Sequence, residues 1–164
     1  MKRNGASARP VRRDRLIQEH NHDTYKARGK CREPAVCPDC GAVYHKGRWQ
    51  WITRPSPAAD TRCPACQRIH DRYPGGYLAL NGPFLAQHRD EIVHLARNVE
   101  EREKSEHPLR RIMAMESRDN GILITTTAME LARAIGDAVH HAYQGALDYR
   151  YTDEANILRV SWRR

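Results

Sequence analysis

Four cysteines in two C-x-x-C pairs are the residues of this chain best suited to chemistry. Cys37 and Cys40 form the first pair, Cys63 and Cys66 form the second, and 22 residues separate the pairs. Each pair can direct two thiolates at one point, and four thiolates satisfy the tetrahedral coordination that Zn²⁺ prefers. Gly41 allows the positive φ at which backbone amides approach the sulfurs. The spacing therefore predicts a zinc ribbon.

A redox role is the main alternative for these pairs. A thioredoxin-like motif needs a strand before its first cysteine and a helix starting at it. The segment GKCREPAV is a poor strand, and PDCGAVYHKG is a poor helix. One redox centre also does not need two pairs. Four thiolates around one zinc leave no open position for water, which predicts a structural site.

The fifth cysteine, Cys31, has no partner in the C-x-x-C pattern. An odd number of cysteines argues against a disulfide framework, and the basic N-terminal segment lacks the apolar stretch of a secretory signal. We therefore expect Cys31 to be a free surface thiol. A role for Cys31 in thiol sensing is an alternative.

Aromatic and basic side chains crowd the segment after the first cysteine pair. The segments AVYH and RWQWIT flank Lys46-Gly47, which predicts a tight hairpin. Trp49 and Trp51 are two residues apart and are expected to share one strand face, either as ribbon core or as platforms for base stacking. The candidate RNA-binding residues here are Lys46, Arg48, Trp49, Trp51, Arg54 and Arg62.

Positive charge is concentrated towards the N-terminus. The net charge is +8, and residues 1–30 hold nine Lys and Arg against three Asp and Glu. Such a field attracts polyanions, so Arg12, Arg13 and Arg15 are also candidate RNA-binding residues. Phosphate contacts do not distinguish RNA from DNA, so a DNA-binding or transcription-linked factor is one alternative. A protein-interaction adaptor and a merely solvated basic tail are two others.

Composition divides the chain into three parts. Residues 1–30 are predicted to form a basic, flexible arm with a short helix near residues 14–20. Residues 31–73 form the zinc ribbon, where several prolines make regular helix improbable. Residues 74–164 are predicted to be an α+β domain with an antiparallel sheet and two helices on one face. No apolar run is long enough to span a membrane, so we expect a cytoplasmic protein without a membrane partner.

Local signals position the elements of the third part. Gly82-Pro83 opens a helix with an apolar stripe to Val99 and a polar, solvated extension that ends before Pro108. A hairpin follows, with its turn at Asn120-Gly121. Thr127 and Glu130 are then expected to form a capping box for the second helix.

Two C-terminal strands complete the predicted sheet. Leu158, Val160 and Trp162 alternate along the last strand and are natural core positions. Arg159 and Arg163 then lie on the opposite face, together with Arg150 of the preceding strand. A solvated sheet face is the plainer interpretation of this pattern, and an RNA-facing sheet is the sharper one.

The run CPDCG…CPACQR…YPGGYLALNGPF resembles the zinc-binding region of the export adaptor of the large ribosomal subunit, including its archaeal relatives. The tail from ITTTAMELARAIG to RVSWRR is similar to the helix-and-hairpin unit that follows in that family. The chain also resembles a small bacterial family of uncharacterised zinc-ribbon proteins with the same layout. The resemblance covers residues 37–164.

This resemblance implies contact with ribosomal RNA of the large subunit, in assembly, quality control or dormancy. It matches the metal positions to Cys37, Cys40, Cys63 and Cys66. The adaptor family has more cysteine pairs, usually binds two metals, and carries later domains and export signals. Nuclear export is therefore not implied for this chain.

Signatures of catalysis are missing from the sequence. We find no nucleophile elbow, phosphate-binding loop or H-E-x-x-H motif. The letters HNHD at residues 20–23 are adjacent, whereas the nucleases named for those letters spread them along a ββα-metal fold. The sequence therefore predicts a non-enzymatic zinc-ribbon protein that binds RNA, with zinc as its cofactor and no small-molecule substrate.

Overall fold

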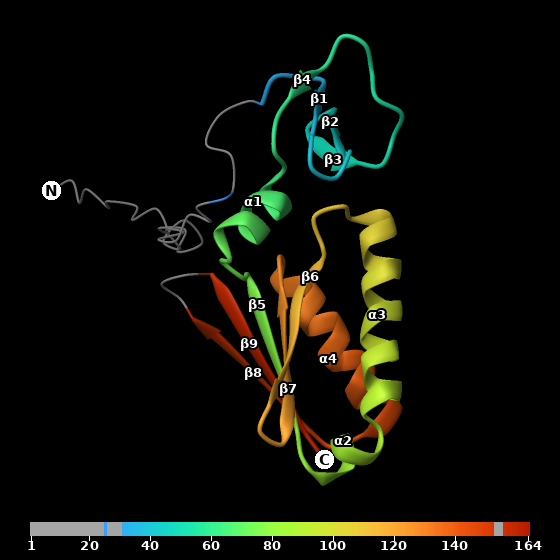
Figure 1. Ribbon diagram of the computed structural model, residues 1–164, viewed down its shortest axis with the longest axis vertical. Coiled ribbons are helices and arrows are strands. Elements are labelled where there is room, and N and C mark those ends of the chain that lie inside the picture. Colours follow the sequence, from blue (N-terminus) through green and yellow to red (C-terminus); the bar gives the residue numbers. More distant parts are fainter. Residues whose placement is uncertain (1–24, 26–30, 153–155) are drawn as a thin grey trace, which may run out of the picture.

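The computed structural model describes Tyr25 and residues 31–152 and 156–164. Within these residues the protein is mixed α+β, with two sheets and four helices (Figure 1). The predicted α+β class is therefore confirmed. The predicted basic arm, with its short helix and Arg12, Arg13 and Arg15, lies outside the described residues apart from Tyr25.

The first sheet has four short strands in the order β3-β2-β1-β4. Its central pair, β1 and β2, is antiparallel, and β4 runs parallel to β1. Lys46 and Gly47 join β2 to β3 with φ values of 52° and 77°, so the predicted tight hairpin is confirmed. The strands are β1 Ala35–Val36, β2 Val43–His45, β3 Arg48–Gln50 and β4 Ala59–Asp60.

A helix, α1 Pro64–Asp71, follows the first sheet, and this corrects the expectation that residues 31–73 contain no regular helix. The prolines that argued against a helix are compatible with this one because Pro64 stands in its first turn, where a missing N–H costs nothing. Cys63 is the N-cap residue, and Arg72 ends the helix with a φ of 52°. A helix thus begins directly at the second cysteine pair.

The second sheet has five strands in the order β6-β7-β5-β9-β8. The prediction of an antiparallel sheet is wrong at its centre, because β5 and β9 are parallel. Leu158, Val160 and Trp162 are buried, so β9 belongs inside the sheet, whereas the largely exposed β8 forms the edge. The strands are β5 Gly76–Asn81, β6 Ile112–Arg118, β7 Gly121–Thr126, β8 Ala146–Thr152 and β9 Ile157–Arg163.

Three further helices are α2 Pro83–Gln87, α3 Arg89–Glu106 and α4 Met129–Tyr143. Helices α3 and α4 lie on the same face of the second sheet (Figure 1), and the main core lies between them and the sheet. The single helix predicted from Pro83 is broken at His88. Its predicted solvated extension is anchored, because buried Glu100 accepts a 2.6 Å hydrogen bond from the Ile112 amide.

Two predicted turn features differ in the structure. Thr127 does not cap α4: its hydroxyl donates to the Leu109 carbonyl at 2.6 Å and accepts from the Arg111 amide at 2.9 Å. The β6–β7 turn is centred on Asp119-Asn120, and Asp119 has the positive φ. Gly121 is already in β7, where a Cβ atom would lie 2.5 Å from the Leu80 carbonyl oxygen. Tertiary packing explains both residues better than local turn chemistry does.

None of the helices in the described ranges is both long and apolar enough to cross a bilayer. The longest, α3, carries charged side chains along much of its length.

Candidate metal centre

The four cysteines of the two C-x-x-C pairs converge on one point. Their sulfur atoms all lie within 4.8 Å of one another, and the Sγ atoms of Cys40 and Cys63 are 3.8 Å apart. Tetrahedral zinc with Zn–S bonds of about 2.3 Å places its sulfurs about 3.8 Å apart. Cys37, Cys63 and Cys66 are buried and Cys40 is half-buried. The four residues are thus positioned to bind one metal ion.

A tight turn aims the first pair. The amide of Gly41 donates to the Cys37 carbonyl at 2.9 Å, and the Cys37 amide donates to the Ala42 carbonyl at 2.8 Å. Gly41 has a φ of 80°, which glycine adopts readily. The predicted positive φ of this glycine is confirmed.

The start of α1 aims the second pair. The Cys66 amide donates to the Cys63 sulfur at 3.4 Å, so Cys63 caps the helix with its thiol. The Cys63 amide donates to the Cys37 sulfur at 3.3 Å, which links the two pairs directly. Helix N-termini favour negative charge, and these amides therefore stabilise thiolates.

Arg111 completes the site from outside the ribbon. Its guanidinium donates to the sulfurs of Cys63, Cys40 and Cys66 at 3.2, 3.3 and 3.3 Å. Only 9% of the residue is exposed, and its Nε donates to the Pro108 carbonyl at 2.9 Å. Four thiolates around a divalent cation carry a net charge of −2, which one buried guanidinium partly offsets. No spacing rule in the sequence connects Arg111 to the cysteines.

The thiols differ in their acidity because their surroundings differ. Burial raises the pKa of Cys37, but backbone amides of Cys63, Cys40 and Asp39 outweigh it and lower that pKa to about 7. Burial raises the pKa of Cys63 and Cys66, against the opposing effect of Arg111 on both. A divalent cation would reverse the effect of burial by binding the thiolate form.

The predicted ribbon, residues 31–73, packs against one end of residues 74–164, which we call the second domain. The Trp51 indole donates to the Lys104 carbonyl near the end of α3 at 2.7 Å. Trp49 and Leu109 both pack against the cysteine cluster. Together with Arg111, these contacts join the first sheet to the loop between α3 and β6, above the second sheet in Figure 1.

Two of the six candidate RNA-binding residues of the ribbon are paired with carboxylates, and two others are exposed. Arg54 and Arg62 are paired with the carboxylates of Asp60 at 3.2 Å and Asp39 at 2.6 Å. Lys46 and Arg48 are exposed on the hairpin.

The two tryptophans also separate, contrary to the expected shared strand face. Strand β3 ends at Gln50, so Trp51 lies beyond it. Trp49 stays in the strand and is half-buried, whereas Trp51 is 39% exposed.

A groove of about 420 Å³ lies where the hairpin meets the second domain. Arg48 and Trp49 line one side with Tyr44, and His107 and Arg110 line the other. The Arg110 guanidinium is paired with Glu103 at 2.6 Å. Arg48 and Trp49, on the hairpin side of this groove, are among the residues predicted from the sequence. Only the tertiary structure places His107 and Arg110 opposite them.

Comparisons of the chain with protein families, curated proteins and solved structures found no match. The geometry of the chain's own residues therefore carries the argument, and the resemblance to the ribosomal export adaptor remains an expectation.

Proposed function

We propose that this chain is a non-enzymatic zinc-ribbon protein that binds RNA of the large ribosomal subunit. The observation that carries the metal assignment is the set of four converging sulfurs, three of them from buried cysteines. Thiolates select soft or borderline cations, and a tetrahedral four-sulfur site suits Zn²⁺, whereas Mg²⁺ and Ca²⁺ prefer oxygen ligands. With all four positions filled by protein, the zinc has a structural role.

The zinc would hold the hairpin in place. Cys37 and Cys40 lie between β1 and β2, so the metal supports the strands that present Arg48 and Trp49 to the groove. Trp49 itself packs against the cysteine cluster. Loss of the metal is therefore expected to disorganise this part of the RNA-binding surface.

The choice of RNA rests on charge and on accessible rings. The net charge of +8 favours a polyanion. Trp51 and Tyr73 are 39% and 41% exposed, and exposed rings suit stacking with unpaired bases. The large ribosomal subunit, with a role in assembly, quality control or dormancy, rests on the resemblance of the cysteine pairs and the Gly75-Gly76-Tyr77 segment.

Sedimentation of the full tagged chain tests this proposal. We expect co-sedimentation with the large subunit in a sucrose gradient, together with about one zinc per chain. Cys63→Ser with Cys66→Ser should abolish zinc binding and weaken co-sedimentation, and Cys31→Ser is the matched control because Cys31 lies outside the cluster. Crosslinked nucleic acid should be sensitive to RNase.

Two outcomes would contradict the proposal. Recovery of wild-type protein only at the top of the gradient, at both low and moderate salt, would argue against ribosome binding. Crosslinks that DNase removes and RNase leaves intact would identify the chain as a DNA-binding factor instead.

A further inference from the structure

The second sheet has one face that the described elements leave open. Leu78 and Leu80 of β5 and Val160 of β9 point into the core beneath α3 and α4. Side chains alternate along a strand, so Tyr77, Ala79 and Asn81 of β5 lie on the other face. In β9, the corresponding residues are Arg159, Ser161 and Arg163, all exposed. Figure 1 shows both long helices on the opposite side.

Carboxylates balance only part of the positive charge on this open face. Two of its four arginines, Arg118 and Arg150, pair with carboxylates of their own strands, Glu116 and Asp148, at 2.7 and 3.1 Å. The other two, Arg159 and Arg163, have no acidic partner among the described residues. Two cations without an acidic partner on one strand face, with Ser161 between them, favour an anionic partner that extends along the strand.

Arg159 is held in position by a ring. Its guanidinium carbon lies 4.4 Å from the centroid of the Tyr77 ring, and the two residues are partners across the parallel β5–β9 pair. A guanidinium stacked on an aromatic ring is oriented by the ring, while its N–H groups remain available for phosphate and its outer face for a base. This geometry suits a nucleotide chain that crosses the sheet.

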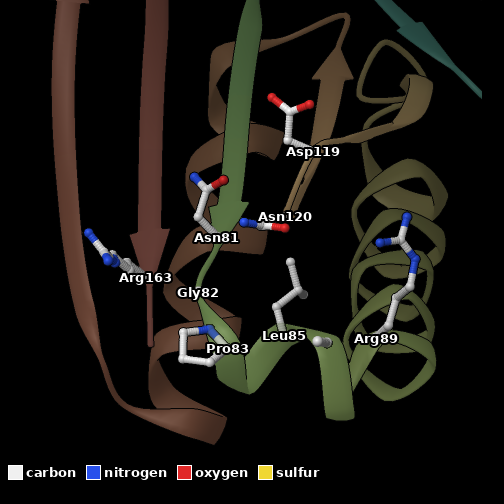
Figure 2. A pocket seen from close by; sticks show the side chains of 9 residues that line it. Asn81, Gly82, Pro83, Leu85, Arg89, Asp119, Asn120 and Arg163 are labelled. Carbon is white, nitrogen blue, oxygen red and sulfur yellow. The ribbon is translucent and has the colours of Figure 1, made fainter.

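A pocket of about 670 Å³ extends this face at the end of β5. Figure 2 shows Asn81 and Asn120 between Arg163 on one flank and Arg89 on the other, with Leu85 beneath them. Neither asparagine amide has a hydrogen-bond partner among the described residues. Amides both donate and accept, which is what the edge of an unpaired base requires.

The backbone next to this pocket is specialised for the Asn81 side chain. Asn81 pairs with Gly121 of β7, and a Cβ atom on that glycine would lie 2.3 Å from the Asn81 Oδ1. The glycine thus leaves room for the amide to lie against β7. The pocket also contains one carboxylate, Asp119, against its two arginines.

We infer that this open face and its end pocket form a binding site for single-stranded RNA. Arg159 and Arg163 contact phosphates, a base stacks on the Arg159–Tyr77 pair, and Asn81 and Asn120 bind the edge of another base in the pocket. The inference rests on the proposed RNA-binding function and assigns its main contact to the second domain. The face carries arginines and a ring across a broad sheet, the arrangement used by sheet-based RNA-binding domains.

Binding of a fluorescent single-stranded oligoribonucleotide to the full zinc-loaded chain tests the inference. We expect Arg159→Gln with Arg163→Gln to weaken binding at least about tenfold and to lower the salt slope by about 1.4, because two phosphate contacts are lost. The matched control is Arg118→Gln with Arg150→Gln, which removes the same charge from the same face. It should change affinity less than about twofold, since both arginines are already paired. Zinc content and thermal unfolding verify that each variant is folded.

The pocket is tested separately by Asn81→Ala. This change should weaken binding about fivefold or more while the salt slope stays constant, because it removes base contacts and no charge. Competition with duplex RNA and duplex DNA of the same sequence should be weak. An unchanged affinity in Asn81→Ala would remove the pocket from the site.

The outcomes separate this inference from the proposed function. If Lys46→Gln with Arg48→Gln abolishes binding and the Arg159 and Arg163 variant does not, the protein binds RNA through the ribbon and the inference is wrong. Equal losses in the Arg159 and Arg163 variant and its matched control would mean a general charge effect and would also overturn it. No binding of any RNA by the wild-type chain would refute the proposed function itself.

Discussion

The two sheets of this protein are held together by different means. Around the first sheet, the buried cluster consists of Ala65 and three cysteines, and a fourth cysteine packs against it. The second sheet has a core of fifteen buried residues between the strands and α3 and α4. We expect a cluster so poor in apolar side chains to depend on a bound metal, whereas the larger core is stabilised by apolar burial. Arg111 belongs to the second domain and contacts the cysteine sulfurs, so it connects the two regions.

Metal removal should give the largest difference between the regions. A chelator is expected to open the ribbon and leave the second domain folded, because structural zinc sites contribute about 10–16 kcal/mol of apparent binding free energy. Tryptophan fluorescence distinguishes the two regions. Trp49 and Trp51 lie in the ribbon, and Trp162 is fully buried in the core of the second domain. In Trp162→Phe, the emission should shift to the red on chelation. In Trp49→Phe with Trp51→Phe, it should not. A shift in both would mean that the regions unfold together.

Truncation of the second core should have the next largest effect. Leu78 is fully buried on β5, and Leu78→Ala is expected to lower the free energy of unfolding by about 2–5 kcal/mol. Urea titration measures this, and the metal content should stay at the wild-type value. Ser161→Ala, on the exposed face of the adjacent strand, is the control and should change stability by less than about 0.5 kcal/mol. Loss of zinc in Leu78→Ala at low urea would show that the ribbon depends on this core.

Substitution of Arg111 should have an intermediate effect, seen as a loss of zinc affinity. Arg111→Ala removes three hydrogen bonds to the cysteine sulfurs and is expected to weaken zinc affinity about 10–100-fold. Arg111→Lys keeps the charge without the guanidinium fork and should fall between Arg111→Ala and wild type. Competition with a chromophoric chelator measures the affinity. Arg110→Ala is the matched control, because Arg110 pairs with Glu103 instead of a sulfur. An Arg111→Ala protein with wild-type affinity would leave the guanidinium without a role at the metal.

The smallest effect concerns pH and belongs to the second domain alone. Burial, together with the hydrogen bond from the Tyr149 hydroxyl to Asp137, raises the pKa of Tyr149 to about 12. A raised tyrosine pKa favours the folded state below the ordinary value of about 10, and this contribution is lost as pH rises towards 12. Wild type should therefore be more stable than Tyr149→Phe at neutral pH, and the difference should vanish at high pH. Urea midpoints measured across this range check the trend. A difference that grows with pH would contradict it.

Local sequence was a good guide where a structure depends on neighbouring residues. The hairpin at Lys46-Gly47 follows from backbone preferences, and the alternation of Leu158, Val160 and Trp162 identifies a strand with one buried face. Proline content was misleading for α1, because the effect of a proline on a helix depends on its position in that helix. Pro64 stands in the first turn of that helix, where proline is favourable.

Contacts between distant residues explain the other differences. Thr127 has the local pattern of a helix cap, but its hydroxyl contacts the Leu109 carbonyl, 18 residues away. In the last hairpin, either β8 or β9 could pair with β5. Strand β9 does so, with its buried face packed on α4. Sequence patterns describe each segment alone and do not rank such partners.

The sequence by itself determined the four candidate metal ligands, because each C-x-x-C pair can direct two sulfurs at one point. Only the tertiary structure decided that Arg111, 45 residues beyond Cys66, contacts three of those sulfurs. It also decided that Arg159 stacks on Tyr77 on an open sheet face. Cysteine spacing acts through a short stretch of backbone, whereas these arginine contacts exist only once whole elements have packed together.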